Sequence, residues 1–179
     1  CTGSLRHQAP LVARDQGEPQ LAVYAEALAK KTYDLPELLV NVLGMVDVGA
    51  YFPHRVTYHT TCHSLRMARI GDTATRLIAA VRGIDYVPLP DSDVCCGFGG
   101  TFSLKNPEVS AAMLSDKMAN IISTGAEIVV AGDYSCLMNI GGGLARSGSG
   151  IRSMHLAEVL AGTEESPWFA PATNTKVGA

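Results

Sequence analysis

The sequence has few charged residues, few aromatic residues and no long apolar run. Charged residues make up 17% of the 179 residues and the formal net charge is −3, which argues against a basic surface for nucleic acid. No apolar run approaches the roughly 20 residues that span a bilayer. Residues 1–20 also lack a basic stretch followed by an apolar core. The sequence therefore predicts no membrane span and no signal peptide, and it indicates a cytoplasmic protein.

Cysteine is scarce as well. The five cysteines are an odd number and are too sparse for the disulfide framework of a small secreted domain. Apolar residues make up 47% of the chain, which is enough for the core of about one ordinary domain. A reduced protein that keeps several thiols more often uses them for metal or redox chemistry, so the cysteines carry the functional signal.

The chain divides into three expected parts. Residues 1–50 are expected to be helices followed by a linker, because apolar residues recur at helical spacing in residues 18–31 and 34–44. Residues 51–163 alternate short β-rich runs with helical segments and form the expected main domain. Residues 164–179 are expected to be a loosely ordered tail.

The alternation within residues 51–163 predicts an α/β fold. Strands are expected over residues 55–59, 84–89, 127–133 and 151–154, and helices over residues 68–83, 106–125 and 156–160. This order implies a parallel sheet with helices on both faces. The uninterrupted β-branched run Ile128–Val130 is typical of a strand that is buried on both faces.

Four cysteines follow the carboxyl ends of predicted strands. Cys62 follows the first strand, Cys95 and Cys96 follow the second, and Cys136 follows the third. Because the carboxyl ends of parallel strands form one ligand-binding edge, the four thiols are expected to converge there. Four thiolates suit an iron–sulfur cluster or a tetrahedral zinc ion. Adjacent cysteines are unusual zinc ligands, which favours the larger cluster.

Glycines follow the adjacent cysteines in the segment CCGFGG. Gly97, Gly99 and Gly100 let the backbone pass close to a bulky cofactor and offer N–H groups to its sulfides. Such hydrogen bonds tune a reduction potential. These glycines are therefore expected to surround the metal.

Three of the five histidines lie at the same predicted sheet edge. His59 and His63 flank Cys62, and His155 follows the fourth strand. We expect them to line the crevice and donate hydrogen bonds, because four cysteines already complete the usual ligand set of a cluster. Arg66 is either a counter-charge for the cluster or an ordinary solvated helix residue.

Two other uses of the cysteines stay open at this point. A zinc-stabilised interaction module would use the same thiols for folding. A thiol or disulfide oxidoreductase would need an exposed cysteine of low pKa.

The segments HTTCHSLR, CCGFGG and CLMNIGG resemble the cysteine-rich CCG-domain family, which includes one of the subunits of heterodisulfide reductase and the iron–sulfur subunits of glycolate oxidase. The resemblance implies a Rossmann-like domain and one [4Fe–4S] cluster, with zinc as the alternative. The implied ligands are Cys62, Cys95, Cys96 and Cys136. Asn139 stands where a fifth family cysteine would be, so the double-cluster site of heterodisulfide reductase is not expected.

The resemblance is closest to the lactate-utilisation branch of the family. It implies an iron–sulfur electron-transfer component of a multiprotein system that oxidises L-lactate to pyruvate, with other iron–sulfur subunits as partners. No flavin or nicotinamide motif is present, so it implies an oxidoreductase subunit without a complete active site of its own. Family members carry two CCG repeats. Cys1 resembles the last cysteine of a first repeat, so the rest of that repeat is expected to be missing from this chain.

Overall fold

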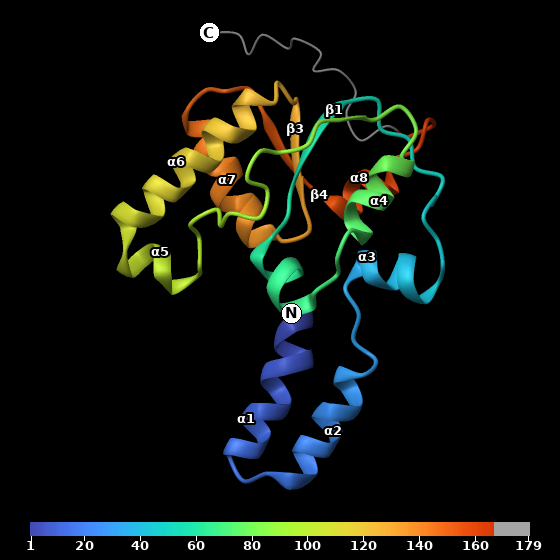
Figure 1. The fold of residues 1–179 in the computed structure, drawn as a ribbon, viewed down its shortest axis with the longest axis vertical. Helices are drawn as coiled ribbons and strands as arrows, with labels where there is room; N and C mark the ends of the chain where they lie inside the picture. Colours follow the sequence, from blue (N-terminus) through green and yellow to red (C-terminus); the bar gives the residue numbers. More distant parts are fainter. Residues whose placement is uncertain (167–179) are drawn as a thin grey trace, which may run out of the picture.

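A computed structural model describes residues 1–166 of the chain (Figure 1). Its centre is a sheet of four parallel strands in the order β2-β1-β3-β4. The strands are β1 (Arg55–His59), β2 (Asp85–Tyr86), β3 (Ile128–Ala131) and β4 (Arg152–His155). The predicted α/β fold with a parallel sheet is confirmed.

Helices cover both faces of this sheet (Figure 1). On one face, α4 (Thr73–Ala80) and α8 (Leu156–Ala161) contribute to a hydrophobic core with alternate residues of β1, β3 and β4. On the other face, α6 (Pro107–Ser123) and α7 (Tyr134–Arg146) pack against Val129 of β3. Side chains of a strand alternate between the faces, so one central strand serves both cores.

Strand β3 is the most deeply buried element. All of its residues, Ile128 to Ala131, have no exposed surface. The expectation of a strand buried on both faces is confirmed. The carboxyl ends of three strands also lie at one level, because His59 pairs with Ala131 and Ala131 pairs with His155.

The chain leaves β1 and β3 in opposite directions. Strand β1 leads through η3 (His63–Ala68) and α4 to its neighbour β2, whereas β3 leads through α7 to its neighbour β4. The helices α4 and α7 lie on opposite faces of the sheet. A crevice therefore opens between the carboxyl ends of β1 and β3, where open α/β sheets bind ligands.

The residues before the sheet form a helical arm that projects away from it (Figure 1). The arm contains η1 (Ser4–Gln8), α1 (Ala9–Asp15) and α2 (Pro19–Ala29), and α2 is the helix expected over residues 18–31. The next expected helix is present as α3 (Leu35–Glu37) and η2 (Leu38–Val42). It begins at Asp34, whose side chain and that of Glu37 form a capping box.

Two expected elements are shorter than the sequence pattern suggested. The strand expected over residues 84–89 is reduced to β2, because Pro88 has no N–H for the ladder after Val87 donates to Val56 O. The helix expected over residues 68–83 begins only at Thr73, because Arg69 and Gly71 have positive φ angles of 53° and 62°.

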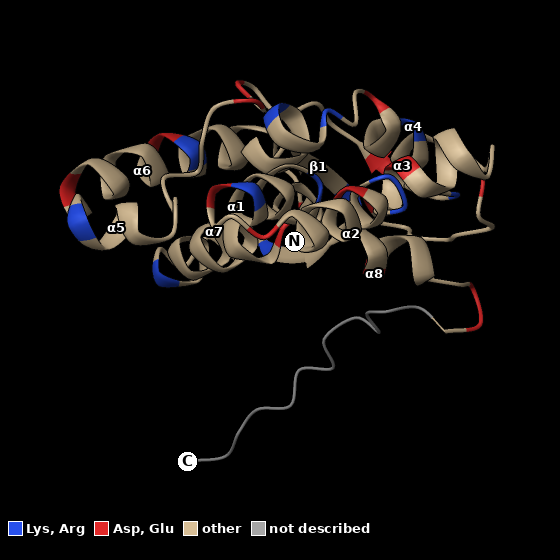
Figure 2. Cartoon of the chain, turned by 90° about the horizontal axis from the view of Figure 1, so that it is seen from below, with Lys and Arg blue, Asp and Glu red and all other residues tan. Residues whose placement is uncertain are grey.

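Helix α5 (Thr101–Lys105) and the helical segment η3 were not expected from the sequence. Of the expected tail, residues 167–179 lie outside the described residues, whereas Glu164 forms an ion pair with Arg82 at 2.6 Å. Lys and Arg are interspersed with Asp and Glu along the helices (Figure 2). Within residues 1–166, every helix is too short or too polar to cross a membrane.

Candidate metal centre

Four cysteines line one cavity at the carboxyl edge of the sheet. The cavity has a volume of about 550 Å³ and contains Cys62, Cys95, Cys96 and Cys136 in its wall. The other lining residues are His63, Arg66, Met67, Phe98, Gly99, Gly100, Asp133 and Ser135. Each cysteine is a free thiol. The structure thus brings together the four cysteines that the sequence placed after three different strands.

Two of these cysteines lie at the starts of helical segments. Cys62 is the N-cap of η3, shortly after β1. Cys136 lies in the first turn of α7, whose N-cap Asp133 follows shortly after β3. The Asp133 carboxylate accepts hydrogen bonds from the backbone N–H of Ser135 at 2.8 Å and from its hydroxyl. Burial raises the pKa of Asp133, but these two bonds outweigh it and hold that pKa below its ordinary value.

The adjacent cysteines lie on a loop that is fastened to two helices. Ser110 of α6 donates a hydrogen bond to Gly97 O at 2.8 Å, and the Asn139 amide of α7 donates to Cys96 O at 2.9 Å. Gly97 has a φ of +88°, and a Cβ there would lie 2.5 Å from Ser110 O. The backbone N–H of Gly97 donates to the sulfur of Cys95 at 3.4 Å. Glycine at this position thus allows a close approach to α6 and supplies a donor to a cysteine sulfur.

The cavity has a buried side and an open side. Cys96 is 1% exposed and Cys136 is 8% exposed, whereas Cys62 and Cys95 are partly exposed. We call Cys96, Cys136 and the neighbouring His59 the inner half, and Cys62 and Cys95 the outer half.

His59 is the last residue of β1 and has no exposed surface. One ring nitrogen and the sulfurs of Cys96 and Cys136 all lie within 4.8 Å of one another. Among the described residues, neither ring nitrogen of His59 has a hydrogen-bond partner that meets ordinary geometry. The inner half is thus a buried set of one nitrogen and two sulfur donors that can hold a metal.

The pKa values of the two thiols in the inner half are shifted in opposite directions. A hydrogen bond from Cys136, aided by the nearby His59 ring, outweighs burial and lowers the pKa of Cys96 to about 4. The same hydrogen bond, together with burial, raises the pKa of Cys136 far above its ordinary value. In the outer half, burial and the neighbouring Cys95 raise the pKa of Cys62, and Arg66 opposes them. A metal ion would bind these sulfurs as thiolates and release their protons.

The two other predicted histidines lie in different surroundings. His63 lines the cysteine cavity, and its Nε2 accepts a hydrogen bond from Gly3 N at 2.9 Å. His155 lines a neighbouring cavity of about 340 Å³. There its Nδ1 accepts from Ala157 N at 3.1 Å, and its ring stacks on that of Tyr134 with the centroids 4.8 Å apart. Of the three predicted histidines, only His63 therefore lines the cysteine cavity itself.

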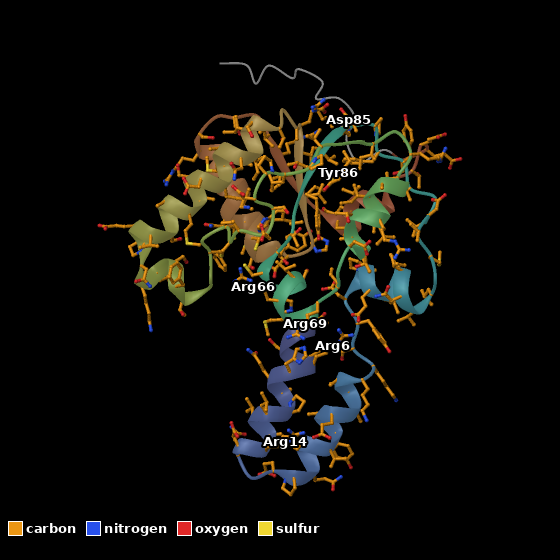
Figure 3. All side chains as sticks on the ribbon, viewed as in Figure 1. Arg6, Arg14, Arg66, Arg69, Asp85 and Tyr86 are labelled. Carbon is orange, nitrogen blue, oxygen red and sulfur yellow. The ribbon has the colours of Figure 1, made fainter. Side chains whose placement is uncertain are left out.

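Arg66 and Cys1 also lie near this cavity. Arg66 lies on η3 and lines the cavity, on the side of η3 toward α7 in Figure 3. Cys1 is exposed and lines the neighbouring cavity, which shares His63 and Asp133 with the cysteine cavity. The structure thus places Cys1 beside the four cysteines but in a separate cavity.

Sequence reasoning missed Lys117, which is 1% exposed. Its ammonium donates to the backbone oxygen of Asp91, a residue with a positive φ of 50° shortly before the adjacent cysteines. Burial lowers the pKa of Lys117, and the nearby Asp91 carboxylate opposes that shift. The burial of Lys117 had a signal in the sequence. Lys117 follows Leu114 by three residues and precedes Ile121 by four, so it lies on the same helix face as these apolar residues.

Comparison with known proteins agrees with the cysteine pattern. Residues 56–141 match the family model described as CCG, cysteine-rich domain. Over 160 residues the chain is 43% identical to a lactate utilization protein A of Oceanobacillus iheyensis, covering 89% of this chain and 64% of that protein. Over 145 residues it is 47% identical to one of Geobacillus thermodenitrificans, covering 81% of this chain and 61% of that protein.

Residues 56–141 of the chain are a cysteine-rich CCG domain. The predicted resemblance to the CCG-domain family is confirmed. The matched region of this CCG domain begins in β1 and ends in α7, so it contains all four cysteines of the cavity. The chain spans less than two thirds of the length of these two relatives.

Proposed function

We propose that the cysteine cavity of this CCG domain holds an iron–sulfur cluster and that the protein carries electrons within a multiprotein system oxidising L-lactate to pyruvate. The observation that carries the proposal is the meeting of four free thiols in one cavity at the sheet edge. The lactate part rests on relatives named lactate utilization protein A, at 43% and 47% identity.

The residues of the cavity fit a soft metal. Thiolate sulfur is the donor that selects iron–sulfur clusters and zinc over calcium and magnesium. The buried His59 ring, whose nitrogens have no hydrogen-bond partner at ordinary geometry among the described residues, also suits a site that a metal completes. The Asp133 carboxylate, which lines the same cavity, already accepts a hydrogen bond from Ser135.

Each part of the cavity contributes to holding and tuning such a group. The four cysteines would be its ligands, and the bound cluster would supply one-electron redox chemistry. The Gly97 N–H donates to the Cys95 sulfur, and hydrogen bonds of this kind raise a reduction potential. The Arg66 side chain places positive charge at the cavity wall, where it offsets the negative charge of thiolates.

Electron transfer in this system would require partner proteins. Oxidation of a hydroxy acid to a keto acid releases a pair of electrons, whereas a single cluster passes electrons one at a time. The sequence has no flavin or nicotinamide motif to accept the pair. Further iron–sulfur subunits are therefore the proposed partners, and the partly exposed Cys62 and Cys95 mark the side of the cluster that they would face.

Anaerobic reconstitution tests the proposal. We expect iron and acid-labile sulfide to bind the protein stoichiometrically and to give a paramagnetic resonance signal after reduction. The Cys96→Ser variant should lose most of the iron, because a hydroxyl is a poor ligand for a soft metal. Cys1→Ser is the matched control and should retain it, since Cys1 lies outside the cysteine cavity.

Stoichiometric zinc without iron or sulfide, after reconstitution with both metals supplied, would contradict the proposal. That result would assign the cavity to a zinc-stabilised interaction module instead. Equal iron in the wild type and the Cys96→Ser variant would also contradict it.

A further inference from the structure

Beside the two buried cysteines, the inner half includes a donor that the four cysteines leave unexplained. His59 ends β1, has no exposed surface and points a ring nitrogen to within 4.8 Å of two cysteine sulfurs. Its place is fixed by the sheet, because His59 pairs with Ala131 in the ladder between β1 and β3. The ring therefore cannot move to the surface without breaking the centre of the sheet.

A buried imidazole without hydrogen bonds is costly. Its donor and its acceptor lose their hydrogen bonds to water on folding and gain none in return. Among the described residues, neither Nδ1 nor Nε2 of His59 has a partner at ordinary hydrogen-bond geometry, and its one polar interaction of this kind is a weaker one with the Cys96 sulfur. Native structures rarely tolerate such groups, and an ion at the site is one of the few explanations for them. The metal-binding atoms near the His59 ring nitrogen are the sulfurs of Cys96 and Cys136.

The spacing of these three donors is close to that of ligands on one metal atom. At metal–sulfur distances of about 2.3 Å and metal–nitrogen distances of about 2.0–2.1 Å, two ligands of a tetrahedral metal lie under about 4 Å apart. The nitrogen of His59 and the two sulfurs lie within 4.8 Å of one another. A small contraction of side chains would bring all three donors within bonding distance of a bound metal group.

Neighbouring polar groups do not compete for this place. The Asn139 amide donates to the backbone oxygen of Cys96, and the Asp133 carboxylate accepts from Ser135. His63, the other histidine near Cys62, accepts from Gly3 through its Nε2. His59 is thus the histidine that faces the buried sulfurs.

We propose that His59 is a metal ligand and binds the metal group at the end that Cys96 and Cys136 hold. This inference rests on the proposed function for the presence of a metal. It replaces the expectation that His59 only donates a hydrogen bond to the cluster. It also makes the metal atom that His59 binds chemically distinct from those held by cysteine alone.

Nitrogen hyperfine spectroscopy of reconstituted protein with ¹⁵N-labelled histidine tests the inference. We expect the wild type to show the strong ¹⁵N coupling of a directly bound imidazole, and the His59→Ala variant to lack it. His54→Ala is the matched control, because His54 lies just before the opposite end of β1, and it should keep the coupling. Metal affinity alone would not decide, since removing a hydrogen-bonding neighbour also weakens binding by about 10- to 100-fold.

A second variant guards against misfolding. His59→Cys keeps a metal-binding atom at the position, so it should bind iron even if His59→Ala does not fold. Circular dichroism and iron content of the two variants then separate loss of the ligand from loss of the fold. Failure of His59→Cys to bind iron in a folded protein would count against the inference.

The outcomes also separate this inference from the proposed function. If Cys96→Ser loses iron while wild-type protein shows no strong ¹⁵N coupling, the cluster stands and His59 is not a ligand. If His59→Ala keeps its iron and only its reduction potential shifts, His59 is a hydrogen-bonding neighbour and the inference is overturned. If neither Cys96→Ser nor His59→Ala changes iron binding, the proposed function fails first.

Discussion

The two halves of the cysteine cavity differ in how the chain holds them. In the inner half, His59 belongs to β1, Cys136 belongs to α7, and Cys96 is held by the Asn139 amide. In the outer half, Cys62 precedes a short helical segment and Cys95 lies on a loop. The inner donors are buried against the hydrophobic core, whereas the outer thiols are partly exposed.

This difference indicates a division of tasks. The inner donors are placed by the same packing that stabilises the domain, so they are expected to be in position before a metal binds. The outer thiols are held by shorter local structure and face the open side, where electrons would enter or leave. Preorganised ligands bind metals more tightly than ligands that must first be ordered.

The largest expected difference is between cysteine variants of the two halves. We expect Cys136→Ser to abolish cluster binding, because little solvent reaches this buried position to replace the lost thiolate. We expect Cys62→Ser to retain part of the iron, because water or hydroxide can occupy a partly exposed ligand position. Iron and sulfide analysis after anaerobic reconstitution measures both. Equal iron content in the two variants would remove the distinction between the halves.

A smaller effect is expected where the cysteine loop contacts α6. Gly97→Ala should destabilise the protein by about 2 kcal/mol and weaken metal binding, because the new Cβ would lie 2.5 Å from Ser110 O at a φ of +88°. Gly148→Ala is the control, since Gly148 also has a positive φ but has nothing within 4 Å of the added Cβ. It should cost about 1 kcal/mol and leave metal binding unchanged.

Denaturant unfolding of the metal-free proteins measures the two glycine effects. If Gly97→Ala and Gly148→Ala cost the same, the contact with Ser110 does not restrain the loop. Retained iron affinity in Gly97→Ala would show that the loop can shift without disturbing Cys95 and Cys96.

The smallest expected effect concerns the helix that carries Cys136. Asp133→Ala should cost about 1 kcal/mol at pH 7, because it removes the N-cap of α7. The folded pKa of Asp133 lies below its ordinary value of 3.8. Its charged form therefore contributes stability above that value, and this contribution is lost as pH falls through the folded pKa. The difference between wild type and Asp133→Ala should shrink on acidification.

Asp133→Asn separates the cap from the charge. Asparagine also caps helices well, so it should keep most of the stability at pH 7 and show less pH dependence between pH 7 and 3. Thermal unfolding at several pH values measures this. A pH dependence as large in Asp133→Asn as in the wild type would assign the effect to other groups.

Much of the fold followed from local sequence patterns. The run at Ile128–Val130 indicated a central buried strand, and the helix expected over residues 106–125 is present as α6. The ends of the helices and strands were harder to predict. The strand at Asp85–Tyr86 is short because of Pro88, and the backbone turns at Arg69 and Gly71 delay α4. Such turns depend on tertiary contacts that a single sequence does not display.

The site was predictable to the level of its cysteines. Strand ends of a parallel sheet meet, so Cys62, Cys95, Cys96 and Cys136 could be grouped from their order alone. The division between buried and exposed thiols could not, because it depends on how the loops pack. The same holds for His59, whose burial beside the Cys96 and Cys136 sulfurs arises from the register of β1 against β3.

A redox titration of the reconstituted protein, followed by paramagnetic resonance, tests the electron-transfer proposal most directly. A cluster held by these four cysteines predicts a signal that appears on reduction, disappears on reoxidation and fits a one-electron transition. Protein that binds metal in the cysteine cavity but shows no reversible signal at any potential would contradict an electron-transfer role.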